Sequence, residues 1–85
     1  MIGNHSIIKE KVSDYIKKSV HVDADKINDG SLIFQEGFLD SMAFIVLITF
    51  LENEFKIKTA DSDLIEENFE SISAITDFVM RKSVN

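Results

Sequence analysis

The fold is decided by the stretch Gly37-Phe38-Leu39-Asp40-Ser41-Met42 and the apolar run behind it, Ala43-Phe44-Ile45-Val46-Leu47-Ile48. Turn-forming residues give way here to a run that is apolar enough for a buried helix. Ser41 is therefore expected at a helix N-terminus, where free backbone N–H groups and the positive end of the helix dipole favour an anion. A phosphate joined to the Ser41 hydroxyl would be held by the same groups. The other interpretation is an ordinary helix start, because Asp and Ser are common N-caps.

Composition limits the kind of protein this can be. A chain of 85 residues predicts one small domain, residues 1–85. It has no cysteine and only two histidines, which disfavours a disulfide framework or a zinc site. No segment is apolar for long enough to span a membrane, and the N-terminus lacks the apolar run of a signal peptide. We expect a cytoplasmic monomer with no bound metal.

The net charge of −6 is the next constraint. An acidic surface repels nucleic-acid phosphates, so DNA or RNA binding is not expected. The same charge suits basic protein partners. Solubility alone explains the charge equally well.

Helical spacing of apolar residues recurs along the chain and predicts an all-α fold. We expect a helix over residues 5–20, a long loop over 21–40 and a second helix over 41–55. A short helix that holds Leu64 and Ile65 is expected to start at Asp61 or Ser62, and residues 68–70 should break it. Ser71 then caps the last helix, whose buried stripe is predicted to consist of Ile72, Ile75, Phe78 and Val79. The result is a small four-helix bundle with three main helices, a short third helix and a long first loop.

The second helix has two different faces. Its core face is predicted to consist of Phe44, Leu47, Ile48, Leu51 and Phe55. On the opposite side, Met42 and Val46 are apolar and lie in the first two turns. Either a neighbouring loop covers these two side chains or they form an exposed patch for a partner. Glu52, further along the helix, would belong to the same docking surface.

The long loop offers a rival function. Its apolar members are expected to point inward: Val22, Ile27, Leu32 and Phe34. Residues 25–36 also follow the calcium loop of an EF-hand at several positions: Asp25 first, Asp29 fifth, Gly30 sixth, Leu32 eighth and Glu36 twelfth. The third position is Ile27, which has no side-chain oxygen, so we predict no tight calcium site here.

Three segments of the chain together resemble the acyl carrier proteins. They are Gly37 to Met42, Leu51-Glu52-Asn53-Glu54-Phe55-Lys56-Ile57, and Glu67-Asn68-Phe69-Glu70-Ser71-Ile72. More closely, the stretch from Ile33 to Ser41 resembles the D-alanyl carrier proteins of teichoic acid synthesis and is similar to freestanding aminoacyl carriers of nonribosomal peptide pathways. Ala43 and Val46 stand where fatty-acid carriers usually have acidic residues, while Thr59 and Ala60 replace an aliphatic residue and a proline. These departures argue against a fatty-acid-synthase partnership.

The resemblance implies a carrier that holds an acyl or aminoacyl group as a thioester on 4′-phosphopantetheine attached to Ser41. It implies that Asp40 presents Ser41 to a phosphopantetheinyl transferase. It also implies an adenylating, acyl-activating enzyme and downstream acyl-transfer enzymes as partners, in fatty acid, polyketide or nonribosomal peptide biosynthesis. The sequence contains no Ser–His–acid spacing typical of a catalytic triad and no glycine-rich phosphate loop, so we do not expect an enzyme. The alternative is a small helical binding module that uses the calcium-like loop or the apolar patch.

Overall fold

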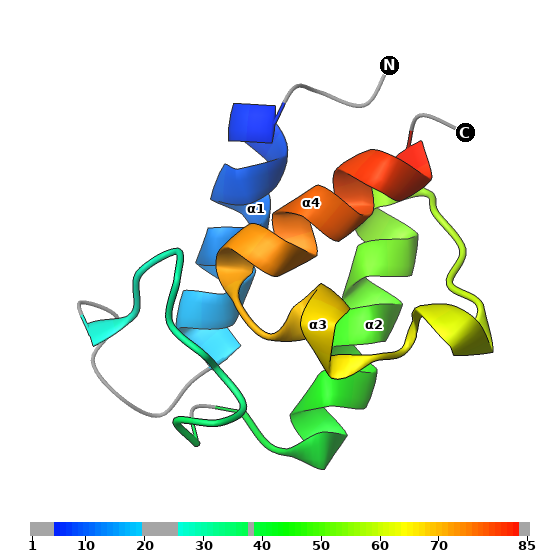
Figure 1. Cartoon of the computed structure of the whole chain (residues 1–85). Helices are drawn as coiled ribbons and strands as arrows, with labels where there is room; N and C mark the ends of the chain where they lie inside the picture. The colour runs from blue at the N-terminus through cyan, green and yellow to red at the C-terminus, as the bar shows by residue number, and fades with distance from the viewer. Residues whose placement is uncertain (1–4, 20–25, 38, 84–85) are drawn as a thin grey trace.

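In a computed structural model, which describes residues 5–19, 26–37 and 39–83, the chain is a small helical bundle (Figure 1). Its elements in order are α1 (His5–Ser19), α2 (Ser41–Phe55), the 3₁₀ turn η2 (Asp61–Asp63), α3 (Glu66–Phe69) and α4 (Ile72–Ser83). The described residues contain no β-strand. The predicted all-α bundle, with three main helices and a short third one, is confirmed.

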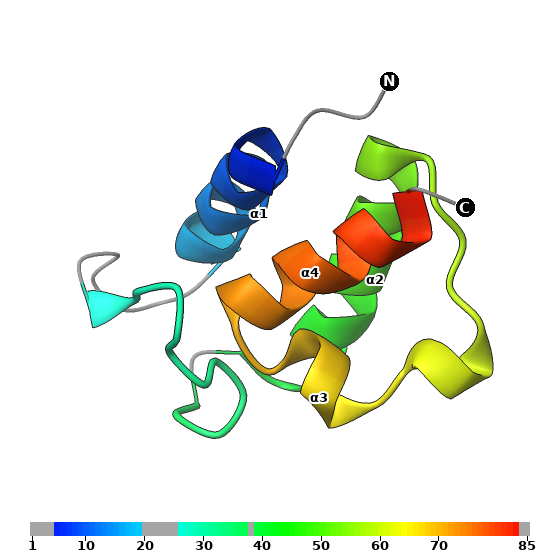
Figure 2. The same cartoon turned by 45° about the horizontal axis from the view of Figure 1, so that its top comes forward.

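The main helices pack around one apolar core, and α4 contacts both α1 and α2. Figure 2 shows the same arrangement from a second direction, with α4 crossing in front of α2. Ile8, Val12 and Ile16 form the buried stripe of α1, as their helical spacing predicts. Tyr15 of α1 stacks on Phe50 of α2 with ring centroids 4.0 Å apart, so aromatic contact ties these two helices together.

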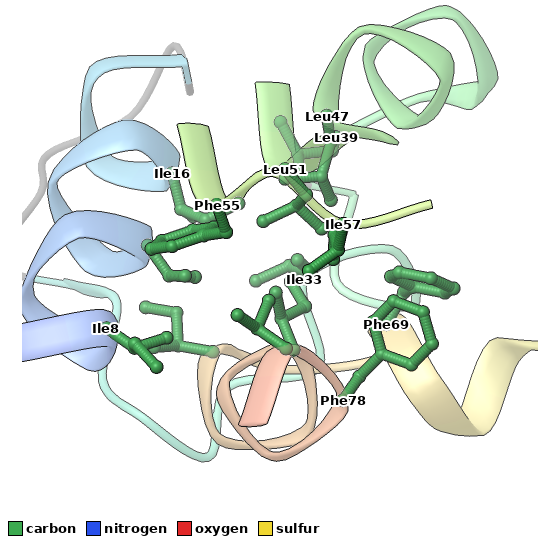
Figure 3. Packing of buried hydrophobic residues seen from close by; sticks show 14 of the residues in the cluster. Ile8, Ile16, Ile33, Leu39, Leu47, Leu51, Phe55, Ile57, Phe69 and Phe78 are labelled. Carbon is green, nitrogen blue, oxygen red and sulfur yellow. The ribbon is translucent and has the colours of Figure 1, made fainter. Parts of the chain in front are cut away.

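The core face of α2 follows the prediction. Leu47, Leu51 and Phe55 are buried, and Phe44 and Ile48 are half-buried against the same cluster. Figure 3 shows Leu47, Leu51 and Phe55 in one core with side chains of α1 and α4. The helix ends at Lys56, which adopts a left-handed conformation with φ of 56°. A left-handed residue at this point is a common helix stop.

The long connection before α2 is held to the core by backbone bonds as well as by side chains. The Ile33 N–H donates to the Glu70 carbonyl at 2.9 Å, and the Ser73 N–H donates to the Asp29 carbonyl at 3.0 Å. The buried apolar side chains of its described part are Ile27, Ile33 and Leu39. The described part of the loop therefore packs against the α3–α4 junction.

One predicted anchor of this loop is wrong. Leu32 is only half-buried, and its neighbour Ile33 is the residue that enters the core. The Ile33 N–H and carbonyl both bond to other parts of the chain, and this fixes which of the two side chains points inward. Ile27 is buried and Phe34 packs against the core, as expected. Val22 lies outside the described residues.

The segment after α2 also differs from the prediction. The short α-helix is α3, and it contains Asn68 and Phe69, which were expected to break it. Leu64 and Ile65 lie between η2 and α3 with their side chains exposed. Phe69 is part of the core instead, with its ring centroid 4.9 Å from that of Phe78. Burial of this large ring outweighs the weak local preference of its neighbours for a turn.

The last helix agrees with its prediction. The Ser71 hydroxyl accepts a hydrogen bond from the Ala74 N–H at 3.1 Å, which is the expected cap. The predicted stripe is buried: Ile72, Ile75, Phe78 and Val79. Thr76 is buried as well, and its hydroxyl donates to the Ile72 carbonyl at 2.8 Å, so this polar group is satisfied within the helix.

Candidate functional site

Asp40 is the N-cap of α2. Its backbone is extended, with φ of −106° and ψ of −174°, and its Oδ1 accepts a hydrogen bond from the Ala43 N–H at 2.9 Å. The Phe44 N–H donates to the Asp40 carbonyl at 3.0 Å. Ser41 is thus the first residue of the helix, as predicted, and its side chain is exposed.

The chain reaches Asp40 through a tight turn. Gly37 has φ of 80°, a value that glycine adopts without the strain that a side chain would bring. The Leu39 N–H donates to the Ile33 carbonyl at 3.1 Å, and the Leu39 side chain is buried. Asp40 and Ser41 therefore stand on an anchored backbone. Phe38, which precedes Leu39 in this stretch, lies outside the described residues.

A cavity of about 580 Å³ lies beside Ser41. Its walls are largely apolar and come from the loop before α2, the start of α2 and the η2–α3 segment. It is lined by Phe34, Gln35, Leu39, Asp40, Ser41, Phe44, Leu64, Ile65, Glu66 and Phe69. Among these, the Gln35 side-chain amide donates to the Glu66 carboxylate at 2.8 Å. Residues far apart in the sequence thus line one open cavity beside Ser41.

The side of α2 that faces away from the core is exposed. Met42 is 69% exposed, Ile45 61% and Val46 52%; these three residues are called the outer α2 face below. No described segment covers them, so of the two interpretations of Met42 and Val46 the exposed patch is the one that the structure has. Sequence reasoning overlooked Ile45, although 100° per residue places it near Met42 and away from Leu47.

Glu52 serves the fold directly. Its Oε2 accepts a hydrogen bond from the Thr59 N–H at 3.0 Å and another from the Thr59 hydroxyl at 2.8 Å. These two bonds hold the pKa of the Glu52 carboxyl below its ordinary value, and the bond from the Thr59 N–H has the larger effect. Glu52 therefore ties the chain after α2 back to the helix. The predicted docking role of Glu52 stays a prediction.

The calcium-like loop uses its described carboxylates in other ways. Asp29 pairs with Lys9 of α1, and the Glu36 carboxylate accepts from the Leu32 N–H at 3.0 Å. Across residues 5–19, 26–37 and 39–83, no group of three or more His, Cys, Asp or Glu side chains is placed to hold a metal ion. Asp25, the first position of that loop, lies outside the described residues. The EF-hand alternative gains no support.

None of the described helices is both long enough and apolar enough to cross a bilayer.

Known proteins resemble this chain over most of its length. The family model described as the phosphopantetheine attachment site matches residues 10–79. The acyl carrier protein of Chlorobium phaeobacteroides is 33% identical over 75 residues, which cover 88% of this chain and 94% of that protein. The D-alanyl carrier protein of Streptococcus uberis is 33% identical over 72 residues, covering 85% and 90%.

A solved structure gives the same result for the fold. The chain matches one in the crystal structure of engineered Bradyrhizobium japonicum glycine:[carrier protein] ligase complexed with carrier protein from Agrobacterium tumefaciens and ATP. The TM-score is 0.75 at 26% identity, over 87% of this chain and 97% of that one. The chain therefore belongs to the phosphopantetheine-attachment family: it is an acyl or aminoacyl carrier protein whose prosthetic group is 4′-phosphopantetheine.

Proposed function

We propose that Ser41 is the residue to which the prosthetic group is attached. The observation that carries this proposal is the position of Ser41: it is the exposed first residue of α2, beside the cavity and within the matched region. Two other serines in that region are buried, and their hydroxyl groups already accept hydrogen bonds from the backbone. The Ser31 hydroxyl accepts from the Asn28 N–H, and the Ser71 hydroxyl caps α4.

The residues around Ser41 fit a phosphodiester. The first turn of a helix presents N–H groups that have no partner within the helix. Asp40 accepts hydrogen bonds from the N–H groups of Ala43 and Phe44. The N–H groups of Ser41 and Met42 are then left to bind phosphate oxygens. When bound, 4′-phosphopantetheine supplies the thiol on which the acyl group is held as a thioester.

Asp40 is proposed to present Ser41 to the phosphopantetheinyl transferase. Its Oδ1 is fixed by the Ala43 N–H, so the carboxylate has a defined direction next to the Ser41 hydroxyl. Its Oδ2 is then available to a metal ion that the transferase brings. The contribution of this chain is to hold these two side chains in place on an anchored helix start.

An amino acid or another small acyl group, loaded by an adenylating ligase, is the proposed cargo. The similarity to D-alanyl carrier proteins and to a chain in a glycine:[carrier protein] ligase complex supports this choice. The apolar cavity beside Ser41 is compatible with a longer chain as well. A long acyl chain inside the bundle would shift many core resonances, whereas an aminoacyl group would leave them nearly unchanged.

The partners are proposed to dock on the outer α2 face and near Glu52. The apolar side chains of this face adjoin Ser41, so an enzyme that acts on Ser41 or its cargo would cover them. The partners are a transferase, the adenylating ligase and downstream acyl-transfer enzymes. The chain itself would carry the cargo and leave catalysis to them, as one domain over residues 1–85, a monomer, in the cytoplasm where coenzyme A and ATP are supplied.

The test is intact mass spectrometry after incubation with coenzyme A and a broad-specificity phosphopantetheinyl transferase. The unmutated protein should gain the mass of one phosphopantetheine, and Ser41→Ala should gain none. Ser62→Ala is the matched control, because Ser62 is also an exposed serine in the matched region, and it should load like the unmutated protein. Unchanged loading of Ser41→Ala would overturn the assignment.

A further inference from the structure

We propose that Asp63 is a positioning residue for the chemistry at Ser41. Its ion pair with Lys82 of α4 fixes the wall of the Ser41 cavity that Leu64 and Ile65 form. This inference rests on the proposed attachment at Ser41. The wall segment is defined here as residues 63–66.

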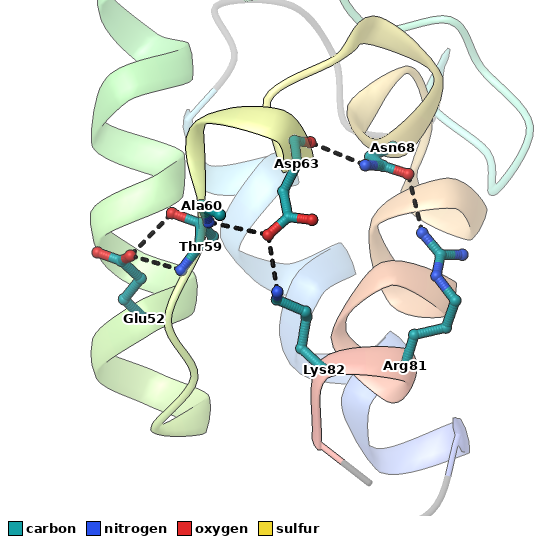
Figure 4. Close-up of polar contacts among 7 residues, drawn as sticks. All are labelled: Glu52, Thr59, Ala60, Asp63, Asn68, Arg81 and Lys82. Atoms are coloured by element: carbon teal, nitrogen blue, oxygen red, sulfur yellow. Dashed lines mark hydrogen bonds and ion pairs between the residues drawn. The ribbon is translucent and has the colours of Figure 1, made fainter. Parts of the chain in front are cut away.

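The wall segment begins at a carboxylate with two donors (Figure 4). Asp63 Oδ2 accepts a hydrogen bond from the Ala60 N–H at 2.8 Å and contacts Lys82 Nζ at 2.7 Å. The two side chains of the pair are only 22% and 27% exposed, so water screens them less than a pair that projects from the surface. One oxygen atom thus joins the start of η2 to the last turn of α4.

A second bridge follows five residues later. The Asn68 side-chain amide donates to the Asp63 carbonyl at 2.8 Å, and its oxygen accepts from the Arg81 guanidinium at 2.8 Å. Figure 4 shows both bridges running from η2 and α3 to the same end of α4. The wall segment is therefore attached to α4 on both sides of Leu64 and Ile65.

The two cations also lie near the ring of Phe78, which is one contact removed from the cavity. The Arg81 guanidinium carbon lies 5.9 Å from the centre of the Phe78 ring, and Lys82 Nζ lies 6.0 Å from it. Phe78 packs against Phe69, which lines the cavity. The end of α4 that bonds to the wall segment therefore also contacts the aromatic pair Phe78 and Phe69.

Beyond α4, the wall segment is tied to the rest of the protein at its far end, where Gln35 donates to the Glu66 carboxylate at 2.8 Å. Leu64 and Ile65 lie between that bond and Asp63. Leu64 is 41% exposed and Ile65 46% exposed, so burial of these side chains contributes only part of what a core position would. Glu52 fixes the chain at Thr59, four residues before Asp63, and does not reach the wall itself. Any enzyme that acts on the Ser41 hydroxyl must come close to this wall. A wall that moves must be ordered on docking, and that ordering weakens binding.

Amide hydrogen exchange on the protein without its prosthetic group tests the structural half. The amides to follow are those of Asp63, Leu64, Ile65 and Asn68, each of which donates a backbone hydrogen bond. Lys82→Gln and Asp63→Asn should raise their exchange rates by about threefold or more, with α1 amides unchanged. Lys82→Arg should restore the slow exchange. High salt should speed exchange in the unmutated protein.

The matched control is Lys11→Gln. It removes the same charge and breaks the Lys11–Glu54 ion pair, which is 2.8 Å long and joins α1 to α2 away from the cavity. The control should leave exchange in the wall segment unchanged. Equal exchange rates in Lys82→Gln and Lys11→Gln would overturn the role of the ion pair.

Transferase kinetics test the positioning half. With a phosphopantetheinyl transferase and coenzyme A, Lys82→Gln and Asp63→Asn should raise the KM for the carrier by about threefold, with kcat unchanged. Lys82→Arg and Lys11→Gln should keep the original KM. An unchanged KM in the first two variants would overturn the positioning role. If the unmutated protein takes up no phosphopantetheine, the attachment at Ser41 fails and the positioning role with it, while hydrogen exchange still decides whether the ion pair fixes the wall.

Discussion

Asp40 and Ser41 are adjacent residues with different surroundings. Asp40 caps α2 through the Ala43 N–H, whereas the Ser41 side chain is exposed at the first helical position. Sequence reasoning left open which of the two is the cap. The structure gives this role to Asp40, because only the residue before the helix has the extended backbone that turns its side chain toward the first-turn N–H groups.

Substitutions at these two positions should differ in their effect on the free energy of unfolding. Asp40→Ala should lower the free energy of unfolding by about 0.5–2 kcal/mol, because an N-cap is lost. Ser41→Ala should change it by less than about 0.5 kcal/mol, since no cap depends on this hydroxyl. Urea denaturation of the protein without its prosthetic group measures both. A larger loss in Ser41→Ala than in Asp40→Ala would contradict the assignment of the cap.

Glu52 and Asp63 are the two carboxylates that fix the chain between α2 and α3. Thr59 lowers the pKa of Glu52, and Lys82, followed by the Ala60 N–H, lowers the pKa of Asp63. A lowered pKa means that folding favours the ionised form. Each group therefore contributes stability that is fully present above its ordinary unfolded pKa and is lost as the pH falls through its lower folded pKa.

The stability of the protein should accordingly fall as the pH drops below about 4, near the ordinary carboxyl pKa values. Unfolding by urea at a series of pH values between neutrality and acid measures this. In the double variant Glu52→Gln and Asp63→Asn, the loss over the same interval should be smaller, because neither side chain can then be protonated. Equal losses in the variant and the unmutated protein would show that these two carboxylates do not contribute to the pH dependence.

At the scale of elements, α2 combines a core face with an apolar outer face. Burying the three side chains of the outer face could contribute on the order of 3–5 kcal/mol before the costs of association. Exposed ion pairs typically contribute only about 0–1 kcal/mol each. The larger share of docking energy is thus expected from apolar contact, and the acidic surface would add speed and orientation.

Val46→Asp should therefore slow loading by the adenylating ligase more than Glu52→Gln does, and the defect should persist at high salt. Glutamine is chosen at position 52 because it can still accept the Thr59 hydrogen bonds. Asn53→Asp is the matched control, since it adds the same charge further along the exposed side of the helix. The measurement is the loading rate of each variant, already carrying its prosthetic group, at low and high ionic strength.

Two results would contradict apolar docking on α2. One is a larger defect in Glu52→Gln than in Val46→Asp. The other is loss of loading of the unmutated protein when salt is raised, because screening acts on charged contacts and not on apolar ones. The transferase reaction should suffer less from Val46→Asp than the ligase reaction does.

At the scale of the whole molecule, the core includes loop residues as well as helices. Ile27, Ile33 and Leu39 come from the long connection and are as well buried as many helix residues. They bring the end of this connection against the α3–α4 junction. One side of the Ser41 cavity is therefore lined by loop residues, namely Phe34, Gln35 and Leu39. In a chain this short, the loop supplies part of the apolar area that a larger domain would draw from additional helices.

Two substitutions in α2, one on its core face and one on its outer face, should differ in their effect on the free energy of unfolding. Leu51→Ala should lower the free energy of unfolding by about 2–5 kcal/mol, because a fully buried side chain is removed from the core. Ile45→Ala should change it by less than about 1 kcal/mol, since its side chain is mostly exposed. Urea denaturation midpoints compare the two. Similar losses would mean that the outer α2 face is covered in solution.

Signals between near neighbours in the chain were enough to determine much of this protein. Helical spacing predicted α1, α2 and the stripe of α4, and turn residues before an apolar run placed Ser41 at a helix start. The family motif around Asp40 and Ser41 is likewise contiguous, so the sequence could indicate a phosphopantetheine carrier before any fold was known.

Tertiary structure alone decided the features that join distant segments. Phe69 enters a helix of only four residues, which is too short to display a period, because the core accommodates its ring. Ile33 rather than Leu32 is buried because backbone bonds to Glu70 and Leu39 fix the loop, and loops have no repeating pattern to read. The Asp63–Lys82 pair and the Ser41 cavity arise in the same way, since packing brings together residues whose separation in sequence carries no local signal.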